Sequence, residues 1–176
     1  ADGDLTRDWA LLAAAGVVSW SGAVEAALPF TPSDLDRSAT ALAALTGRPR
    51  APVRQDSFRS LGETAEELVR TLGWEERPQV LLEGRDLDAV LRDPEAAALP
   101  EPQRRALAYL ALAGGLSPFS DGRYRVSQPP SRGRVVPALV RVGEAYDAFG
   151  LKKGTVAAVD GHRLRLVRGK GEVRLL

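Results

Sequence analysis

The sequence of 176 residues predicts a mainly α-helical fold with a small C-terminal antiparallel β-meander, an α+β class. Three observations predict this class. Two stretches 98 residues apart repeat one pattern, apolar residues recur at helical spacing over most of the chain, and from Lys153 onward they recur at every second position.

The repeated pattern is an apolar helix that runs into glycine and then into a loop. Residues 12–19 read Leu-Ala-Ala-Ala-Gly-Val-Val-Ser, and residues 110–117 read Leu-Ala-Leu-Ala-Gly-Gly-Leu-Ser. Each copy continues to an aromatic residue, an arginine and a second apolar helix. These residues are Phe30 and Arg37 in the first copy and Tyr124 and Arg132 in the last. A unit of this size cannot bury its own apolar face, so the units are expected to pack together.

The first unit covers about residues 1–47. A helix over about residues 8–15 is expected to end at Gly16, because glycine commonly follows the last helical turn. After a loop, Ser33 or Asp34 is expected to cap a second helix. The unit therefore reads as helix, loop, helix.

The middle of the chain, about residues 56–94, is less regular. Ser60 and Glu63 have capping-box spacing before an apolar helix that Gly73 ends. A short helix is expected over residues 84–91. This segment is either a third copy of the unit or an unrelated connection.

The last unit covers about residues 100–150. Asp121 and Gly122 form an expected turn between its two helices. The second helix is expected to start at Val135 or Val136, because Pro137 fits only a first turn. Residues 1–150 would then form one helical repeat domain.

Residues 151–176 change to strand spacing. Asp160-Gly161 and residues 169–171 are turn signals between three short β segments. Such a meander is marginal alone. It either packs on the helical part or begins a further domain.

Composition limits the function classes. Apolar residues make up 44% and charged residues 27%, as in ordinary globular proteins. No stretch reaches the roughly 18 apolar residues that a membrane span requires, so no membrane span is expected. Ala1 in place of methionine fits a mature secreted chain or an excised piece.

Charge is unevenly distributed. Residues 1–119 hold 12 arginines against 18 acidic residues, a net of −6, and residues 120–176 hold 12 Lys or Arg against 5 acidic residues, a net of +7. The basic end suggests an anionic partner, or it only solvates the surface. Nucleic acid is not the expected partner, because no recognition motif accompanies the charge.

The last unit resembles the S-layer homology repeat. The matching text is Ala106 to Leu116, Asp121 to Tyr124, Gln128 to Pro130 and Ser131 to Arg134, with Gly133-Arg134 where the family has Ala-Glu. The resemblance implies a pseudo-threefold bundle of helix–loop–helix repeats in a secreted protein that holds to cell-wall polysaccharide or peptidoglycan. More weakly, the chain resembles the front part of stage II sporulation protein D-like proteins, which implies an attached peptidoglycan-acting domain.

The resemblance also implies where a ligand would bind. The expected ligand-binding residues are Arg132, Arg37, Ser131, Tyr124, Arg134 and Trp20. An arginine at a helix start adds a bidentate guanidinium to unpaired backbone N–H groups, which suits a carboxylated sugar. Alternatively, Arg37 and Arg132 only tie the loop to the helix, and the aromatic residues belong to the core. The chain would then be a protein–protein interaction scaffold.

No catalytic site or cofactor is expected. His162 is the only histidine and lies beside an expected turn, and the absence of cysteine excludes disulfides and thiolate chemistry. Glu63, Glu66 and Glu67 lie where a solvated helix face is expected, so they do not indicate a paired-carboxylate site. The sequence therefore predicts a binding module and not an enzyme.

Overall fold

The computed structural model describes residues 2–18, 26–73, 84–145, 156–160, 163–168 and 171–175. The helices are α1 (Asp2–Ala14), α2 (Pro32–Thr46), α3 (Leu61–Thr71), α5 (Gly84–Val90), α6 (Pro94–Ala97), α7 (Glu101–Leu112) and α8 (Arg132–Ala145). The strands are β1 (Val156–Asp160), β2 (Arg163–Arg168) and β3 (Gly171–Leu175). Expectations for Trp20 and His162 fall outside the described residues.

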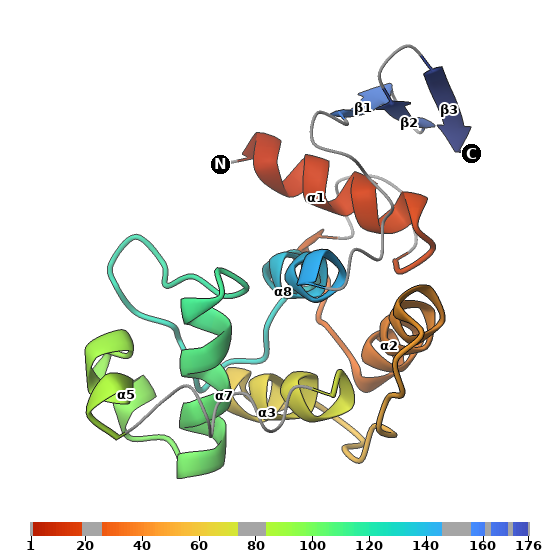
Figure 1. The fold of residues 1–176 in the computed structure, drawn as a ribbon. Coiled ribbons are helices and arrows are strands. Elements are labelled where there is room, and N and C mark those ends of the chain that lie inside the picture. The colour runs from red at the N-terminus through yellow and green to blue at the C-terminus, as the bar shows by residue number, and fades with distance from the viewer. Residues whose placement is uncertain are drawn as a thin grey trace.

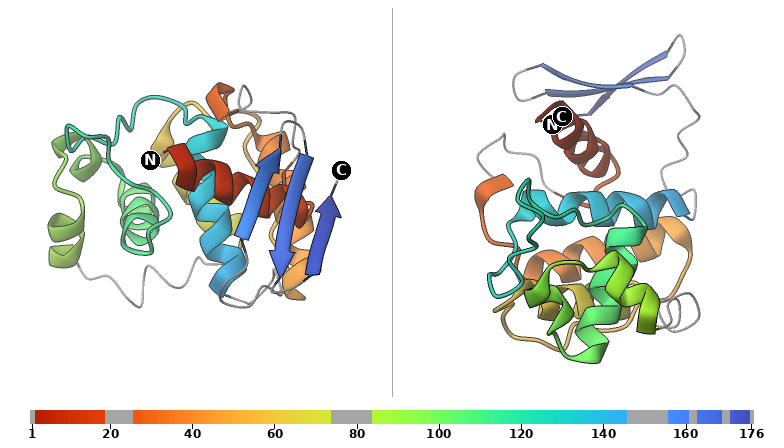
Figure 2. Two further views of the ribbon diagram at one scale, coloured as in Figure 1. Left: turned by 90° about the horizontal axis from the view of Figure 1, so that it is seen from above. Right: turned by 90° about the vertical axis from the view of Figure 1, so that its left-hand side faces the viewer.

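The helices pack in pairs around α8 and α7 (Figure 1). α1 contacts α8 on one side and β1 and β2 on the other, so it lies between the strands and the remaining helices (Figure 2). α8 also contacts α2, while α3 and α5 pack against α7. The three strands pair antiparallel in chain order, with Val159 opposite Leu164 and Leu166 opposite Val173.

The fold is mainly helical, as predicted, but the predicted α+β class built as a pseudo-threefold repeat bundle is wrong, because the helices of the middle segment do not repeat the pairs on either side. In the described part of residues 2–145 there are seven helices and no strand. The hydrophobic core, among the residues whose side chains the structure describes, runs from Trp9 to Val142. The middle segment supplies α3 followed by helices of only 7 and 4 residues, so it does not repeat the long helix pairs on either side.

The local repeat is confirmed at the ends of α1 and α7. Gly16 and Gly114 both have positive φ angles, +78° and +79°. The chain then turns back by the same backbone hydrogen bond in both places. The Val17 N–H donates to the Leu12 carbonyl at 2.8 Å, and the Gly115 N–H donates to the Leu110 carbonyl at 2.7 Å. These glycine turns are of the kind that commonly ends helices.

The cap of α2 differs from the prediction. Thr31 is the capping residue, and Asp34 completes a capping box three residues later. The Asp34 N–H donates to Thr31 Oγ1 at 3.2 Å, and the Thr31 N–H donates to Asp34 Oδ2 at 2.9 Å. Pro32 at the first helical position fixes the start, because its missing N–H needs no partner there. Gly47 ends the helix as predicted.

α8 starts at Arg132, earlier than predicted, so Pro137 lies inside the helix. Ser131 makes this early start possible, because its hydroxyl accepts the Arg134 N–H at 3.4 Å. Pro137 then leaves the Gly133 carbonyl without its usual helical donor. The prediction was wrong because the Ser131 hydroxyl, and not Pro137, fixes the start of the helix.

The starts of α2, α3 and α8 lie together. The segments before α2 and α8 pair as short extended pieces, with the Phe30 N–H donating to the Pro130 carbonyl at 3.0 Å. The Leu61 N–H donates to the Val126 carbonyl at 3.0 Å. The rings of Phe30 and Phe58 stack with their centroids 5.9 Å apart. Segments from all parts of the helical region therefore meet where these three helices begin.

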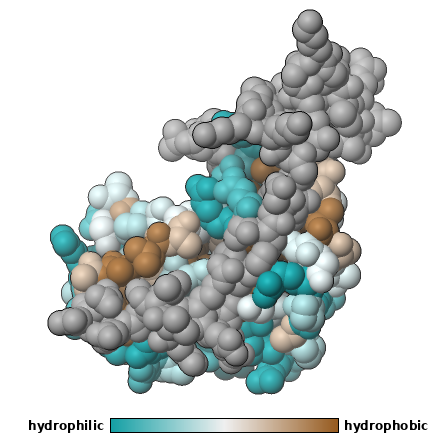
Figure 3. Space-filling view, viewed as in Figure 1, coloured by the Kyte–Doolittle hydropathy of each residue, from teal (hydrophilic) through white to brown (hydrophobic). Residues whose placement is uncertain are grey.

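Most of the coloured surface in Figure 3 is hydrophilic, with a hydrophobic area on the side where α7 lies. The large hydrophobic residues that are exposed in the described part of the chain are Leu28, Leu45, Leu112 and Phe119. Of these, Leu45 lies on the solvent side of α2.

Candidate functional site

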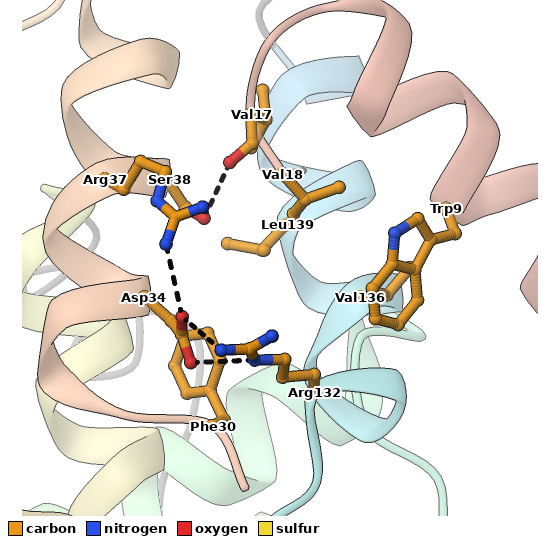
Figure 4. A pocket seen from close by; sticks show the side chains of 10 residues that line it. All are labelled: Trp9, Val17, Val18, Phe30, Asp34, Arg37, Ser38, Arg132, Val136 and Leu139. Carbon is orange, nitrogen blue, oxygen red and sulfur yellow. Dashed lines mark hydrogen bonds and ion pairs between the residues drawn. The ribbon is translucent and has the colours of Figure 1, made fainter. Parts of the chain in front are cut away.

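A pocket lies between the first turns of α2, the end of α1 and the start of α8 (Figure 4). Its apolar wall consists of Trp9, Val17, Val18, Phe30, Val136 and Leu139. Its polar side carries Asp34, Arg37, Ser38 and Arg132. The Ser38 hydroxyl donates to the Val17 carbonyl at 3.0 Å, which ties α2 to the turn after α1.

Asp34 is the central charge of this pocket. Arg132 binds it through both arms of its guanidinium, with Nε 3.1 Å from Oδ2 and Nη2 3.1 Å from Oδ1. Arg37 approaches the same carboxylate, with Nη2 3.7 Å from Oδ1. The Thr31 N–H also donates to Oδ2. One carboxylate therefore connects the starts of α2 and α8 and closes the cap of α2.

The three charged side chains differ in exposure. Asp34 is 11% exposed, Arg132 26% and Arg37 54%. Because the carboxylate and the Arg132 fork are sheltered, their pairing is less screened by solvent than a surface ion pair. Arg37 lies toward the solvent side of the pocket. This edge of the pocket can attract an anion.

The enclosed space is small. It measures about 30 Å³, room for a water molecule or two. Sites for drug-sized ligands are typically about 300 Å³ or more. A sugar ring would therefore lie at the mouth of the pocket, against Arg37 and the apolar wall, and not inside it.

Two other expected ligand residues, Tyr124 and Arg134, lie together in a separate cluster. The Tyr124 ring is buried. Burial raises the pKa of the Tyr124 hydroxyl, with the Arg134 charge opposing and the Asp93 charge adding to the rise. Burial also lowers the pKa of the Arg134 guanidinium, and the nearby Arg125 charge lowers it further. Neither residue lines the Asp34 pocket.

The structure thus divides the six expected ligand residues. Arg37 and Arg132 meet at Asp34, Tyr124 and Arg134 meet elsewhere, Ser131 caps α8, and Trp20 lies outside the described residues. Arg37 and Arg132 do not occupy equivalent positions, because Arg132 is the first residue of α8 while Pro32 is the first residue of α2.

Sequence reasoning missed Asp34 as the partner of Arg132. The two residues are 98 positions apart, the same separation that relates the two glycine turns. Opposite charges at one offset of an internal repeat are the signal that could have suggested the pair. Asp34 had instead been assigned to capping alone.

Among the described residues, no group of three or more His, Asp or Glu side chains is arranged to hold a metal ion. No helix in that part of the chain is long and apolar enough to cross a membrane. No family model, curated protein or solved structure matches this chain. Fold and pocket together define a mainly helical protein with an ion-paired, apolar-walled pocket between α1, α2 and α8.

Proposed function

We propose that this chain is a non-catalytic, secreted cell-envelope module that binds an anionic cell-wall glycan or peptidoglycan at the Asp34 pocket. The observation that supports the proposal is that two arginines share one carboxylate beside the apolar wall of the pocket. In this proposal the module binds the wall itself or positions an attached peptidoglycan-acting domain. The resemblance of residues 106–134 to S-layer homology repeats supports the same class of ligand.

The chemistry of binding follows from the charges. Arg37 is exposed enough to take a ligand carboxylate directly. A carboxylate that reaches further would compete with Asp34 for the Arg132 fork. Trp9 and Phe30 are buried behind the mouth of the pocket, so the half-buried Val18 is the part of the apolar wall that a sugar ring can contact. An incoming anion must therefore compete with the Asp34 carboxylate for Arg132.

The second candidate is a protein–protein interaction scaffold without glycan binding. It is favoured because the Arg132 guanidinium is already paired with Asp34 through two nitrogen atoms, and because the enclosed volume of the pocket is small. In that case the Asp34–Arg132 pair only joins α2 to α8, and its loss affects stability alone.

Retention on purified cell-wall polysaccharide and on peptidoglycan separates the two candidates. We expect Arg37→Gln to lower the affinity about tenfold, the effect of one lost charged hydrogen bond. Asp34→Asn should raise the affinity, because it removes the internal competitor and leaves both arginines in place. The matched control is Arg105→Gln, which removes one positive charge, that of a partly buried arginine paired with the exposed Glu101 on α7.

Nonspecific charge attraction would also shift retention in opposite directions, but it would weaken retention of Arg105→Gln as much as that of Arg37→Gln, so an effect confined to the pocket variants supports the site. Absence of retention of the unmodified protein at modest salt would contradict glycan binding and favour the scaffold. So would equal retention of all four proteins. Circular dichroism of each variant verifies that the fold is kept.

A further inference from the structure

The turn between α7 and α8 presents an aromatic ring at the surface. The Phe119 N–H donates to the Arg123 carbonyl at 2.8 Å, and the Gly122 N–H donates back to the Phe119 carbonyl at 2.9 Å. Asp121 accepts the Arg123 N–H at 3.0 Å, which stiffens the turn. The ring of Phe119 is 39% exposed. A short, hydrogen-bonded loop therefore holds this ring in a fixed place.

Two guanidinium groups lie over that ring. The Cζ atom of Arg125 is 4.1 Å from the Phe119 centroid, and that of Arg134 is 4.4 Å from it. Each contact contributes about 0.5 to 1 kcal/mol at an exposed site, but two like charges beside one ring also repel. Arg125 has a φ of +54°, the one positive φ at a non-glycine residue in the described part of the chain. Holding Arg125 there costs about 1 kcal/mol or more of backbone strain.

The carboxylates near Arg125 and Arg134 do not neutralise these two guanidinium groups. Asp121 Oδ2 is 3.9 Å from Arg125 Nη2. Both side chains are half exposed, so this ion pair contributes little to stability. Nearby Asp93 already accepts the backbone N–H groups of Glu95 and Tyr124. Across the described residues, no carboxylate lies within ion-pair distance of Arg134, whose Nη2 is buried with no hydrogen-bond partner. A buried donor left unpaired costs about 1 to 3 kcal/mol.

We propose that Arg125 and Arg134, stacked on Phe119, form a second binding site, separate from the Asp34 pocket, for an oxyanion such as a phosphate or carboxylate. An oxyanion that accepts hydrogen bonds from both guanidinium groups removes their repulsion. The exposed part of the Phe119 ring then lies beside whatever carries the anion, and a sugar or another ring can stack on it. Phosphate is expected to bind more tightly than a carboxylate, because it offers more oxygens and more charge to two guanidinium groups.

Calorimetric titration of the full chain tests this site, with sodium phosphate and sodium acetate as probes and sodium chloride at matched ionic strength as the reference. We expect saturable phosphate binding that weakens at least tenfold in Arg125→Gln and in Arg134→Gln. Arg105→Gln should bind phosphate as the unmodified chain does. Acetate binding that the same two variants weaken extends the site to carboxylates.

Phosphate heats no larger than those of chloride would overturn the proposal. So would phosphate binding that survives both Arg125→Gln and Arg134→Gln. If Arg134→Gln fails to fold, Arg125→Gln alone decides, because Arg125 is half exposed on a surface loop. The site is independent of the proposed glycan function, because neither Arg125 nor Arg134 lines the Asp34 pocket.

Discussion

Replacing Leu110 by alanine is expected to lower the free energy of unfolding by about 3 kcal/mol. Leu110 is 1% exposed, and its carbonyl accepts the N–H of Gly115 where the chain turns after α7. Truncation leaves a cavity in a core that helices enclose on several sides. Urea denaturation followed by tryptophan fluorescence measures the loss.

The matched control lies two residues further along the same helix. Leu112 is 61% exposed, so Leu112→Ala should change stability by about 0.5 kcal/mol or less. Leu12→Ala should behave like Leu110→Ala, because Leu12 occupies the same place before the first glycine turn. Equal effects of Leu110→Ala and Leu112→Ala would contradict the described core.

Replacing Asp93 by alanine is expected to cost a similar amount, about 2 to 3 kcal/mol. Asp93 is 3% exposed and caps α6 by accepting the Glu95 N–H at 3.0 Å. Its other oxygen accepts the Tyr124 N–H at 2.8 Å across 31 residues of chain. Alanine leaves the buried Tyr124 N–H without a partner, and the same denaturation experiment reports the cost.

Asp93→Asn separates charge from hydrogen bonding. Asparagine retains one oxygen acceptor and its capping ability, so about half of the loss should return. If Asp93→Asn lowered the free energy of unfolding as much as Asp93→Ala does, the carboxylate charge, and not the two hydrogen bonds, would stabilise this junction. No loss in Asp93→Ala would contradict the junction itself.

The residues that start and end the helices were predictable from sequence, because capping depends on local chemistry. Gly16, Gly47 and Gly73 end their helices with positive φ angles, as glycine tolerates. Ser60 caps α3 at the expected spacing. Thr31 and Ser33 are both residue types that cap helices. Thr31 caps α2 because its hydroxyl accepts the Asp34 N–H.

The fold class and the pocket were not predictable in the same way. The pairing of Arg132 with Asp34 depends on where α8 lies against α2, which no local pattern encodes. Similarly, Arg134 was predicted as a ligand-binding residue, but nothing in the sequence indicated that it packs on Phe119. Its contact with Phe119 depends on the path of the whole loop. Non-local geometry therefore decided which charges became neighbours.

The pairing of residues 28–30 with residues 130–132 has a consequence for biosynthesis. Backbone groups of Leu28 and Phe30 find their partners about 100 residues later in the chain, so the entrance to α2 remains open until α8 has left the ribosome. The N-terminal helix pair is consequently not an autonomous folding unit. A nascent chain halted after α7 would expose Phe30 and Phe58, which makes it a substrate for chaperones.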